Sequence, residues 1–450
     1  MSRYVPNTPA DQISMLESIG YKSIDDLFAD IPDTVKIKDK LNLPDAISEM
    51  ELAGYMRRLA GENKNIDDYI CFLGAGAYDH YIPSVIHHIT GRSEFYTAYT
   101  PYQPEISQGT LQTIFEYQTM ICELTGMDVA NASLYDGATA LAEAAFMACG
   151  ITRRDEVLVS DALHPEYREV LKTYSKFRNI KVNNLKFTEG RIDLDQLKSA
   201  VSKNTAAVII QSPNFFGAIE AIDVIAQIAH DYKALLIVCV DPISLALLEP
   251  AGKLGADIVT GEGQALGNEL SLGGPYLGFF ATTQKYMRRM PGRIVGQTTD
   301  EYGRRGYVLT IQTREQHIRR DKATSNVCSN ENLNALAAAV YMTVMGRQGL
   351  KEVAMQSLNK AHYAFNKIIS IPGITPLFSA PFFKEFAVKL PISPEKLNKK
   401  LLSSGIIGGY SLAKDYPLLD NGWLIAVTEK RTKQEIDFMC QKVGEIINEG

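Results

Sequence analysis

An aspartate stands at the end of a strongly apolar segment, Leu235–Val240, and is followed directly by Pro242. A carboxylate at the end of a buried central strand can pair with the protonated ring nitrogen of a bound cofactor, and this pairing strengthens the ring as an electron sink. The same Asp241 could instead cap a following helix, because aspartate before proline is a common helix start. The sequence alone leaves both roles open.

A glycine-containing turn, Ser133–Thr139, opens an alanine-rich segment that we predict to be a helix. The free N–H groups of a helix start, together with the positive end of its dipole, favour a phosphate, and Gly137 and Thr139 would line such a site. Asp136 argues against this, because it occupies the expected N-cap position, where its carboxylate would satisfy those donors and repel a phosphate. Ordinary capping and a former phosphate site filled by the chain's own anion both stay open.

Two further polar residues follow predicted strands. His164 follows Glu156–Ser160 and could stack on a cofactor ring or form only structural hydrogen bonds. Asn214 follows Ala206–Gln211 and could bond a cofactor oxygen, although the nearby Gly217 fits a tight turn equally well. Functional residues of open α/β sheets gather at the C-terminal ends of strands, so we expect both residues near a common site.

Another predicted strand, Asp257–Thr260, leads to Gln264 and then to the glycine-rich run Gly273–Gly278. In enzymes that hold pyridoxal phosphate (PLP), a lysine after such a strand forms a Schiff base with the cofactor. No lysine occurs between Lys253 and Lys285, and the amide nitrogen of glutamine is not nucleophilic. The scaffold therefore has a catalytic arrangement without its central nucleophile, which indicates one half of a two-part enzyme.

The stretch Phe95–Glu105 contains Tyr96, Tyr99 and Tyr102 together with two prolines. Because residues before proline avoid the helical region, we expect this stretch to be extended. It suits an exposed substrate mouth or subunit contact, or else a loop that buries its aromatic rings beneath the sheet.

The segment Lys285–Lys322 carries ten lysines and arginines against four acidic residues. A solvated basic face is the simplest interpretation. The glycines, tyrosines and glutamines between the charges favour instead an ordered loop that contacts anions or an acidic partner surface, with Arg293 and Arg314 as candidates.

The composition is that of a globular protein, with 450 residues, 46% hydrophobic and 22% charged. A net charge of −6 and a pI near 5.8 give no electrostatic support for nucleic acid or an anionic membrane surface. Six scattered cysteines without a C-x-x-C motif favour reduced thiols over disulfides or a metal site. The start of the chain lacks a secretory pattern, and no apolar run approaches the ~18–20 residues that span a bilayer. We expect a cytoplasmic protein.

Three regions follow from the patterns along the chain. Residues 1–65 form a helical arm that lies over another subunit or the main body, 66–330 a large α/β domain, and 331–450 a smaller α+β domain. Continuous apolar strands between helices indicate a mainly parallel sheet covered on both faces. Besides the strands above, we predict strands at 180–185, 234–240, 276–281, 386–390 and 423–427, and helices at 11–20, 48–61, 166–177, 194–202, 222–231, 332–346, 350–369, 394–403 and 433–448.

Several long runs together resemble the P-protein of the glycine cleavage system, the PLP-dependent glycine decarboxylase. The resemblance covers nearly the whole chain and is strongest to subunit 1 (alpha) of the two-subunit form. The runs that carry it are Tyr96–Gly109, Leu124–Thr139, Ser271–Gly278, Arg293–Gln297 and Ile311–Arg319.

The resemblance implies the fold-type-I architecture of PLP enzymes, a mainly parallel seven-stranded sheet with helices on both faces. In that family the subunit 2 chain holds the PLP lysine in a His-Lys-Thr motif, and Gln264 stands at the lysine position here. Asp241 corresponds to the cofactor aspartate, Asp136–Thr139 to the phosphate turn, and His164 to the ring-stacking position. These residues, with Asn214, would form a vestigial pocket that holds no covalently bound PLP.

The resemblance also implies an activity and partners. The family decarboxylates glycine and passes the aminomethyl group to the lipoyl arm of H-protein, an oxidoreductase reaction in which PLP accepts the electrons left after decarboxylation. Subunit 2 would supply PLP and its lysine, in an assembly with two copies of each subunit. The Tyr96–Tyr102 loop and the arginines between 293 and 320 would complete the partner's active site.

Two alternatives remain. The chain could be a self-sufficient PLP-dependent aminotransferase or lyase that uses a displaced lysine able to reach the pocket floor beside Asp241. It could also be a non-catalytic scaffold or ligand-binding module, which a ligand would stabilise without any effect on the turnover of a partner.

Overall fold

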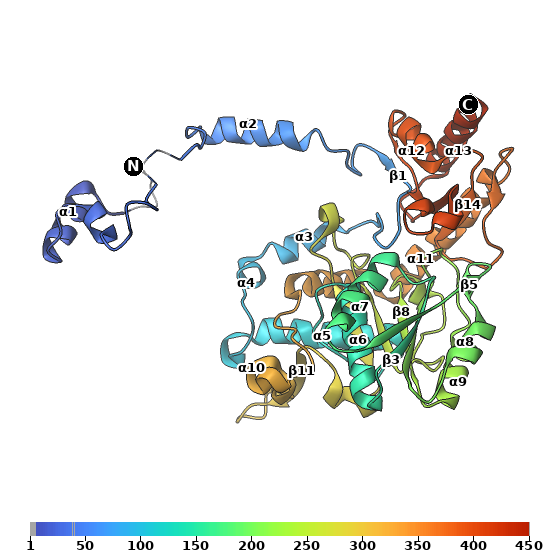
Figure 1. Cartoon of the computed structure of the whole chain (residues 1–450), viewed down its shortest axis with the longest axis horizontal. Helices are drawn as coiled ribbons and strands as arrows, with labels where there is room; N and C mark the ends of the chain where they lie inside the picture. Colours follow the sequence, from blue (N-terminus) through green and yellow to red (C-terminus); the bar gives the residue numbers. More distant parts are fainter. Residues whose placement is uncertain (1–5, 38, 40, 450) are drawn as a thin grey trace. The chain divides into compact units, whose positions relative to one another are not determined.

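The computed structural model describes residues 6–37, 39 and 41–449. The chain forms two compact units, Met1–Lys64 and Asn65–Gly450, and each is described by itself (Figure 1). Residues 1–5, where the absence of a secretory pattern was expected, and parts of the predicted arm lie outside the described residues. The predicted division of the larger unit at residue 330 stays a prediction.

Two α-helices of the first unit begin at reciprocal caps. α1 (Pro9–Ser18) starts after Thr8, whose hydroxyl accepts a hydrogen bond from the N–H of Asp11 while the Asp11 carboxylate accepts one from the N–H of Thr8. α2 (Glu49–Ala60) starts with the same arrangement. Such pairs satisfy N–H groups that have no partner within the helix, and both helices lie where the sequence predicted them.

The second unit is built on a seven-stranded sheet whose strands are, in spatial order, β2 (Val129–Ala130), β10 (Gly278–Thr282), β9 (Ile258–Glu262), β8 (Leu235–Val240), β7 (Thr205–Ser212), β3 (Glu156–Ser160) and β4 (Lys181–Leu185). β10 runs antiparallel to both neighbours, and the other pairs are parallel. The expectation of a mainly parallel sheet is confirmed, and its longer strands begin and end within two residues of their predicted positions.

Helices cover both faces of this sheet; they are α5 (Gln108–Thr125), α6 (Gly137–Thr152), α7 (Pro165–Lys176), α8 (Leu194–Ala200), α9 (Ile222–Asp231) and the first part of α11 (Asn332–Ile368). Val208 and Val238 pack in one core with α5, α8, α9 and α11, whereas Ile209 and Ile237 pack in a second core with α6 and α7. Successive strand residues face opposite ways, so the sheet is the central layer of three (Figure 1).

The C-terminal part carries its own sheet and core. Its strands, in spatial order, are β13 (Thr375–Pro376), β14 (Glu385–Lys389), β17 (Gly422–Ala426) and β16 (Tyr410–Ser411), and its helices are α12 (Pro394–Leu402) and α13 (Lys433–Asn448). Trp423 lies fully buried in this core. The sequence predicted two helices with a break after Gly346, and the structure has one element, α11, with a non-helical kink at Gly346.

Two sequence predictions need correction. Phe95–Glu105 is not extended throughout, because α4 (Ser93–Tyr96) forms a short helix before the prolines restrict the chain. The basic segment contains an unpredicted antiparallel hairpin of β11 (Ile294–Thr299) and β12 (Arg305–Thr310). Its turn is closed by Asp300, which accepts hydrogen bonds from two N–H groups of the turn. The remaining short α-helices and strands are α3 (Ser84–Thr90), β1 (Ile70–Cys71) paired with β15 (Ile406–Ile407), β5 (Phe187–Thr188), β6 (Arg191–Ile192) and α10 (Gln316–Arg319).

Within the described residues, every helix is too short or too polar to cross a lipid bilayer.

Candidate functional site

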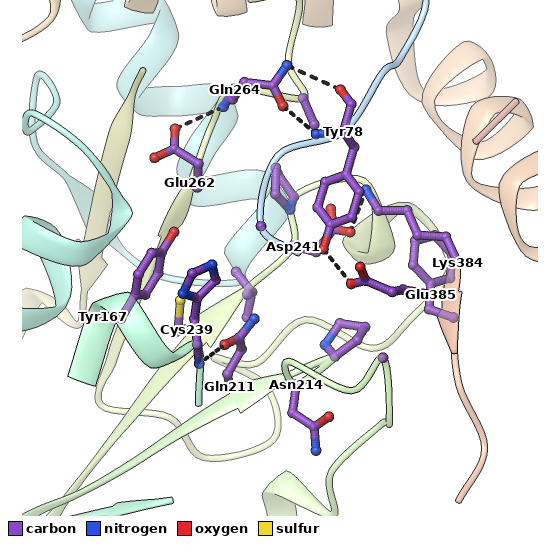
Figure 2. A pocket seen from close by; sticks show the side chains of 18 residues that line it. Tyr78, Tyr167, Gln211, Asn214, Cys239, Asp241, Glu262, Gln264, Lys384 and Glu385 are labelled. Carbon is purple, nitrogen blue, oxygen red and sulfur yellow. Dashed lines mark hydrogen bonds and ion pairs between the residues drawn. The ribbon is translucent and has the colours of Figure 1, made fainter. Parts of the chain in front are cut away.

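A small cavity lies at the C-terminal ends of β7, β8 and β9, the edge where an open α/β sheet places its site (Figure 2). It brings together Asp241, His164, Asn214 and Gln264, as the sequence predicted. Its volume is ≈ 40 Å³, room for about three water molecules at roughly 10–15 Å³ each. Sites for small organic ligands usually measure about 300–1,000 Å³, so the chain's own side chains fill most of the space.

Asp241 does not cap the following helix, which was one of the two roles that the sequence left open. Its Oδ1 accepts a hydrogen bond of 2.9 Å from the N–H of Ile243 within a turn, and the short 3-10 helix Ser244–Ala246 has Ile243 at its N-cap without a side-chain capping bond. Its Oδ2 lies 2.7 Å from the Nζ of Lys384, in a salt bridge whose two side chains are 12% and 2% exposed. The cationic partner of Asp241 is thus a lysine of the same chain.

Lys384 was not identified from the sequence. It precedes β14, and its Nζ also lies 2.9 Å from the Nε2 of His80 and 3.7 Å from the centre of the Tyr78 ring. The opposite ring nitrogen of His80, Nδ1, lies 2.6 Å from the Oε2 of Glu429. The one local signal was an adjacent charged pair, Lys384 and Glu385, at the start of an apolar strand, where charges are rarely buried unless paired.

Gln264 is 3% exposed, and both ends of its amide are occupied. Its Oε1 accepts a hydrogen bond of 3.0 Å from the N–H of Tyr78. Its Nε2 donates to the carbonyl oxygens of Tyr78 at 3.2 Å and Asn268 at 2.8 Å. The side chain therefore fastens the Tyr78 segment across the cavity, as Figure 2 shows.

The start of α6 is occupied by acidic side chains. Asp136 is the N-cap, and its carboxylate accepts from the N–H of Thr139 at 2.8 Å. The Oε2 of Glu262 accepts from the N–H of Gly137 at 2.9 Å. The cap at Asp136 is present, as both interpretations left open by the sequence require, and Glu262 is an additional anion that sequence analysis missed.

Both ring nitrogens of His164 form hydrogen bonds with other groups of the chain. Its Nδ1 accepts from the N–H of Glu166 at 3.2 Å, so the proton of the neutral ring lies on Nε2, which donates to the carbonyl oxygen of Ala75 at 2.8 Å. The ring stacks on Tyr167 with centroids 4.7 Å apart. Burial lowers the pKa of His164, which favours this neutral form.

Asn214 organises its own loop. Its Oδ1 accepts from the N–H groups of Phe216 and Ala218, at 3.0 and 3.1 Å, and its Nδ2 donates to the carbonyl oxygen of Gly190 and to Glu220. Gly217, in the same turn, has a φ of +84°. The structural role that the sequence left open for Asn214 accounts for all of its polar atoms.

Burial shifts the other ionisable groups of the cavity toward their neutral forms. It raises the pKa values of Glu262 and Glu385 each to about 7, and that of the Cys239 thiol to about 12. The hydroxyl of Tyr78 donates to Glu385 at 2.8 Å. The Lys384–Asp241 pair is therefore the principal fixed charge pair of the cavity wall.

The residues expected at a subunit contact divide into two groups. Tyr96 is 69% exposed and Tyr99 is 86% exposed. Arg293 is 4% exposed, and its guanidinium donates within the chain to the hydroxyl of Tyr102 and the carbonyl oxygen of Cys328. Arg314 donates to the carbonyl oxygens of Met290, Gly292 and Ile311. The two arginines thus fix loops of this chain, whereas the two tyrosines lie exposed, and their role at a subunit contact stays a prediction.

Solved structures with a similar fold define the class. A crystal structure of glycine decarboxylase (P-protein) of the glycine cleavage system, in inhibitor-bound form, matches with a TM-score of 0.92 and 42% identity, covering 99% of this chain and 100% of that one. A sphingosine-1-phosphate lyase from Burkholderia pseudomallei shares the fold at a TM-score of 0.67 and 15% identity, over 93% of this chain and 94% of that one. The chain has the fold of type I PLP-dependent enzymes.

Sequence comparisons narrow this class to a family. The model of the family "Glycine cleavage system P-protein" matches residues 2–443. "Probable glycine dehydrogenase (decarboxylating) subunit 1" of Carboxydothermus hydrogenoformans is 56% identical over 442 residues, 98% of this chain and 99% of that protein. The protein of the same name in Bacillus subtilis is 56% identical over 443 residues, again 98% and 99%. The chain belongs to the glycine cleavage system P-protein family, which confirms the resemblance.

The residues present do not fit the cofactor that this fold usually holds. Gln264 offers no amine for a Schiff base, and its amide is saturated. Asp241 is paired with Lys384, so it is not available to a ring nitrogen. Asp136 and Glu262 occupy N–H groups at the start of α6. Each of the contacts that would hold PLP is thus made by a side chain of this protein.

Proposed function

We propose that this chain is the subunit of a two-subunit, glycine-decarboxylating dehydrogenase that carries no PLP of its own. The observation that carries the proposal is Gln264, which stands at the lysine position and bonds both backbone groups of Tyr78. A side chain so engaged can neither form a Schiff base nor leave room for one. The relatives named as subunit 1, which match this chain over nearly its full length, support the assignment to that subunit.

The chemistry then takes place on a partner. Subunit 2 supplies PLP and its lysine, glycine is decarboxylated, and the aminomethyl group passes to the lipoyl arm of H-protein. PLP supplies the electron sink for that reaction. This chain pairs with subunit 2 in pseudo-symmetric fashion, with two copies of each in a cytoplasmic assembly. A rigid, self-filled pocket suits a subunit that positions its partner.

Exposed apolar side chains of the first unit need a surface that covers them. In the first unit, Leu16 is the one buried apolar side chain among the described residues. Large apolar side chains on that unit are otherwise exposed, so the unit requires a covering surface, either of a partner subunit or of the main body of this chain. In the second unit Tyr96, Tyr99 and Ile106 are 69%, 86% and 81% exposed. The exposed side chains of the first unit are Ile13, Met15, Ile19, Tyr21, Ile24, Leu27, Phe28, Ile31, Val35, Ile37, Leu41, Leu43, Ile47, Met50, Leu52, Tyr55, Met56 and Leu59.

A self-sufficient PLP enzyme would need a displaced lysine, and Lys384 is the lysine that lines the cavity. Its Nζ is held by Asp241 and His80. A lysine amine becomes nucleophilic when its charged form is disfavoured, whereas an adjacent carboxylate favours the charged form. Lys384 therefore has the environment of a structural cation. A volume of ≈ 40 Å³ also argues against an organic ligand in this particular cavity.

An absorption spectrum of the purified chain with excess PLP tests the proposal. We expect no aldimine band near about 420 nm, no PLP trapped by borohydride, and glycine-decarboxylating activity only after subunit 2 and lipoylated H-protein are added. Mass spectrometry after reduction would locate any trapped PLP. A PLP adduct on Lys384 would establish the displaced-lysine alternative and overturn the proposal.

A further inference from the structure

A buried ammonium group lies in the wall of the cavity. The side chain of Lys384 is 2% exposed, and its Nζ lies 2.7 Å from Asp241, which is 12% exposed. Removing a charge from water is expensive unless a partner compensates for it. A lysine at this depth therefore has to be explained by the groups that surround it.

Three different groups around Nζ select a positive charge. The Asp241 carboxylate lies at 2.7 Å. The face of the Tyr78 ring, with its centroid at 3.7 Å, attracts cations through the negative charge density of its π-system. His80 offers Nε2 at 2.9 Å, and its Nδ1 faces Glu429 at 2.6 Å, which places the ring proton on Nδ1 and leaves Nε2 as an acceptor.

We propose that the Lys384 ammonium takes the place of the cationic ring nitrogen that Asp241 would otherwise bind, so that a built-in cation replaces the cofactor in this pocket. The pocket then remains a cation site, defined by Asp241, Tyr78 and His80, with its ligand covalently attached to the chain. This goes beyond the absence of a Schiff-base lysine, which would prevent covalent attachment but would leave Asp241 free for a ring.

The inference accounts for the small volume of the cavity as well as for the pairing of Asp241. The Lys384 side chain and the Tyr78 ring lie side by side across the space beside Asp241 (Figure 2). Gln264 fastens the backbone of Tyr78 from the other side. Restoring a lysine at position 264 would therefore leave the ring position full and Asp241 neutralised.

Truncation of the Lys384 side chain tests the inference. Lys384→Ala leaves the Cβ atom and opens a space that lacks the outer methylenes and the ammonium group. We expect the melting temperature to fall by on the order of 5–10 °C, because Asp241 is left buried without its partner. Ethylammonium and n-propylammonium should restore part of this loss in a saturable manner, since a ligand that binds only the folded state stabilises it.

Two control compounds distinguish rescue by the charge of the amine from rescue by its volume and from a general effect of salt. 1-Propanol has the size of the missing group without its charge, and tetramethylammonium at equal ionic strength has charge without a fitting shape. Neither should rescue the variant. Lys430→Ala is the matched lysine control, because Lys430 also pairs with a buried carboxylate, Asp79, but its own side chain is 27% exposed. Amines should not rescue a site that water can enter.

A refolding assay and two further variants, Lys384→Ala/Asp241→Asn and Lys384→Met, allow the inference to be tested even if Lys384→Ala does not fold. If Lys384→Ala does not fold alone, its refolding yield with ethylammonium and with 1-propanol becomes the readout. The double variant Lys384→Ala/Asp241→Asn, which removes both charges, should fold and show no response to amines. Equal rescue by 1-propanol, equal rescue of the double variant, or full stability of Lys384→Met would overturn the inference. None of these readouts involves PLP or subunit 2, so they are independent of the proposed function.

Discussion

Gln264 and Tyr78 are joined by a pair of hydrogen bonds in opposite directions, from the Tyr78 N–H to Oε1 at 3.0 Å and from Nε2 to the Tyr78 carbonyl oxygen at 3.2 Å. The side-chain amide thus bonds the N–H and the C=O of one residue, as an opposite residue does in an antiparallel sheet, and its donor and acceptor are suited to this. The position that would hold a catalytic amine thus holds a structural clamp.

Replacement of this clamp by lysine should not create a PLP enzyme. In Gln264→Lys the Tyr78 N–H loses its acceptor and a new charge enters a buried site, so we expect a loss of about 2–4 kcal/mol in the free energy of unfolding. Urea denaturation measures this loss, and the absorption spectrum with PLP should show no aldimine. Gln227→Lys, on the exposed face of α9, is the matched control and should be neutral. A stable Gln264→Lys protein with an aldimine band would show that the pocket is still able to accept the cofactor.

The cap of α6 should contribute through its hydrogen bond and not through a ligand. Asp136→Ala removes the acceptor of the Thr139 N–H and should lower the free energy of unfolding by about 1 kcal/mol. Asp136→Ser keeps a capping oxygen without the charge and should retain most of the stability. Chemical denaturation of the two variants in parallel provides the measurement. Equal losses in both would point to the charge of Asp136, in place of its capping bond, as the stabilising feature.

Glu385 should make the stability depend on pH between its ordinary and its folded pKa. Burial raises the pKa of its carboxyl from 4.5 to about 7. In that window the folded state binds the proton more tightly than the unfolded state, so stability is full below pH 4.5 and falls as the pH rises toward 7. The shift corresponds to on the order of 3 kcal/mol.

The variant Glu385→Gln keeps an acceptor for the N–H of Ala75 and a polar contact for the hydroxyl of Tyr78, but it cannot ionise. Its free energy of unfolding should therefore vary less with pH than that of the natural chain, and should exceed it above pH 7. Unfolding curves recorded at several pH values test this difference. The exposed Glu123→Gln provides the control, and an unchanged pH profile in Glu385→Gln would contradict the assignment.

The exposed tyrosines should matter for the partner and not for the chain itself. Tyr96→Ser and Tyr99→Ser remove side chains that are 69% and 86% exposed, so the melting temperature of the isolated chain should stay nearly unchanged. Aromatic residues often dominate interfaces, and we expect the Kd for subunit 2 to rise about tenfold or more. Calorimetric titration provides the measurement. Phe177→Ser, which removes a ring that is 82% exposed at the end of α7, should leave the Kd unchanged.

The sequence by itself determined the features that depend on residues close together in the chain and on periodic apolar patterns, namely strands and helix caps. The apolar runs gave six of the seven strands of the main sheet within two residues, because a strand buried on both faces needs continuous apolar side chains. The two-residue strand β2 was not predicted. The cap at Asp136 was also visible, since it bonds to Thr139 only three positions away. The glutamine at position 264 was found because the run that follows it is recognisable.

The tertiary structure decided which groups meet across the pocket. Gln264 and Tyr78 are 186 positions apart, and no local pattern connects them. Lys384 reaches Asp241 only because the start of β14 packs beside the C-terminal ends of β7 and β8. Arg293 and Arg314 belonged to a basic segment that resembled a surface, yet their guanidinium groups bond to carbonyl oxygens inside the chain. The burial of these side chains and the groups that they bond depend on packing between segments far apart in the sequence. This packing is fixed only when the whole chain has folded.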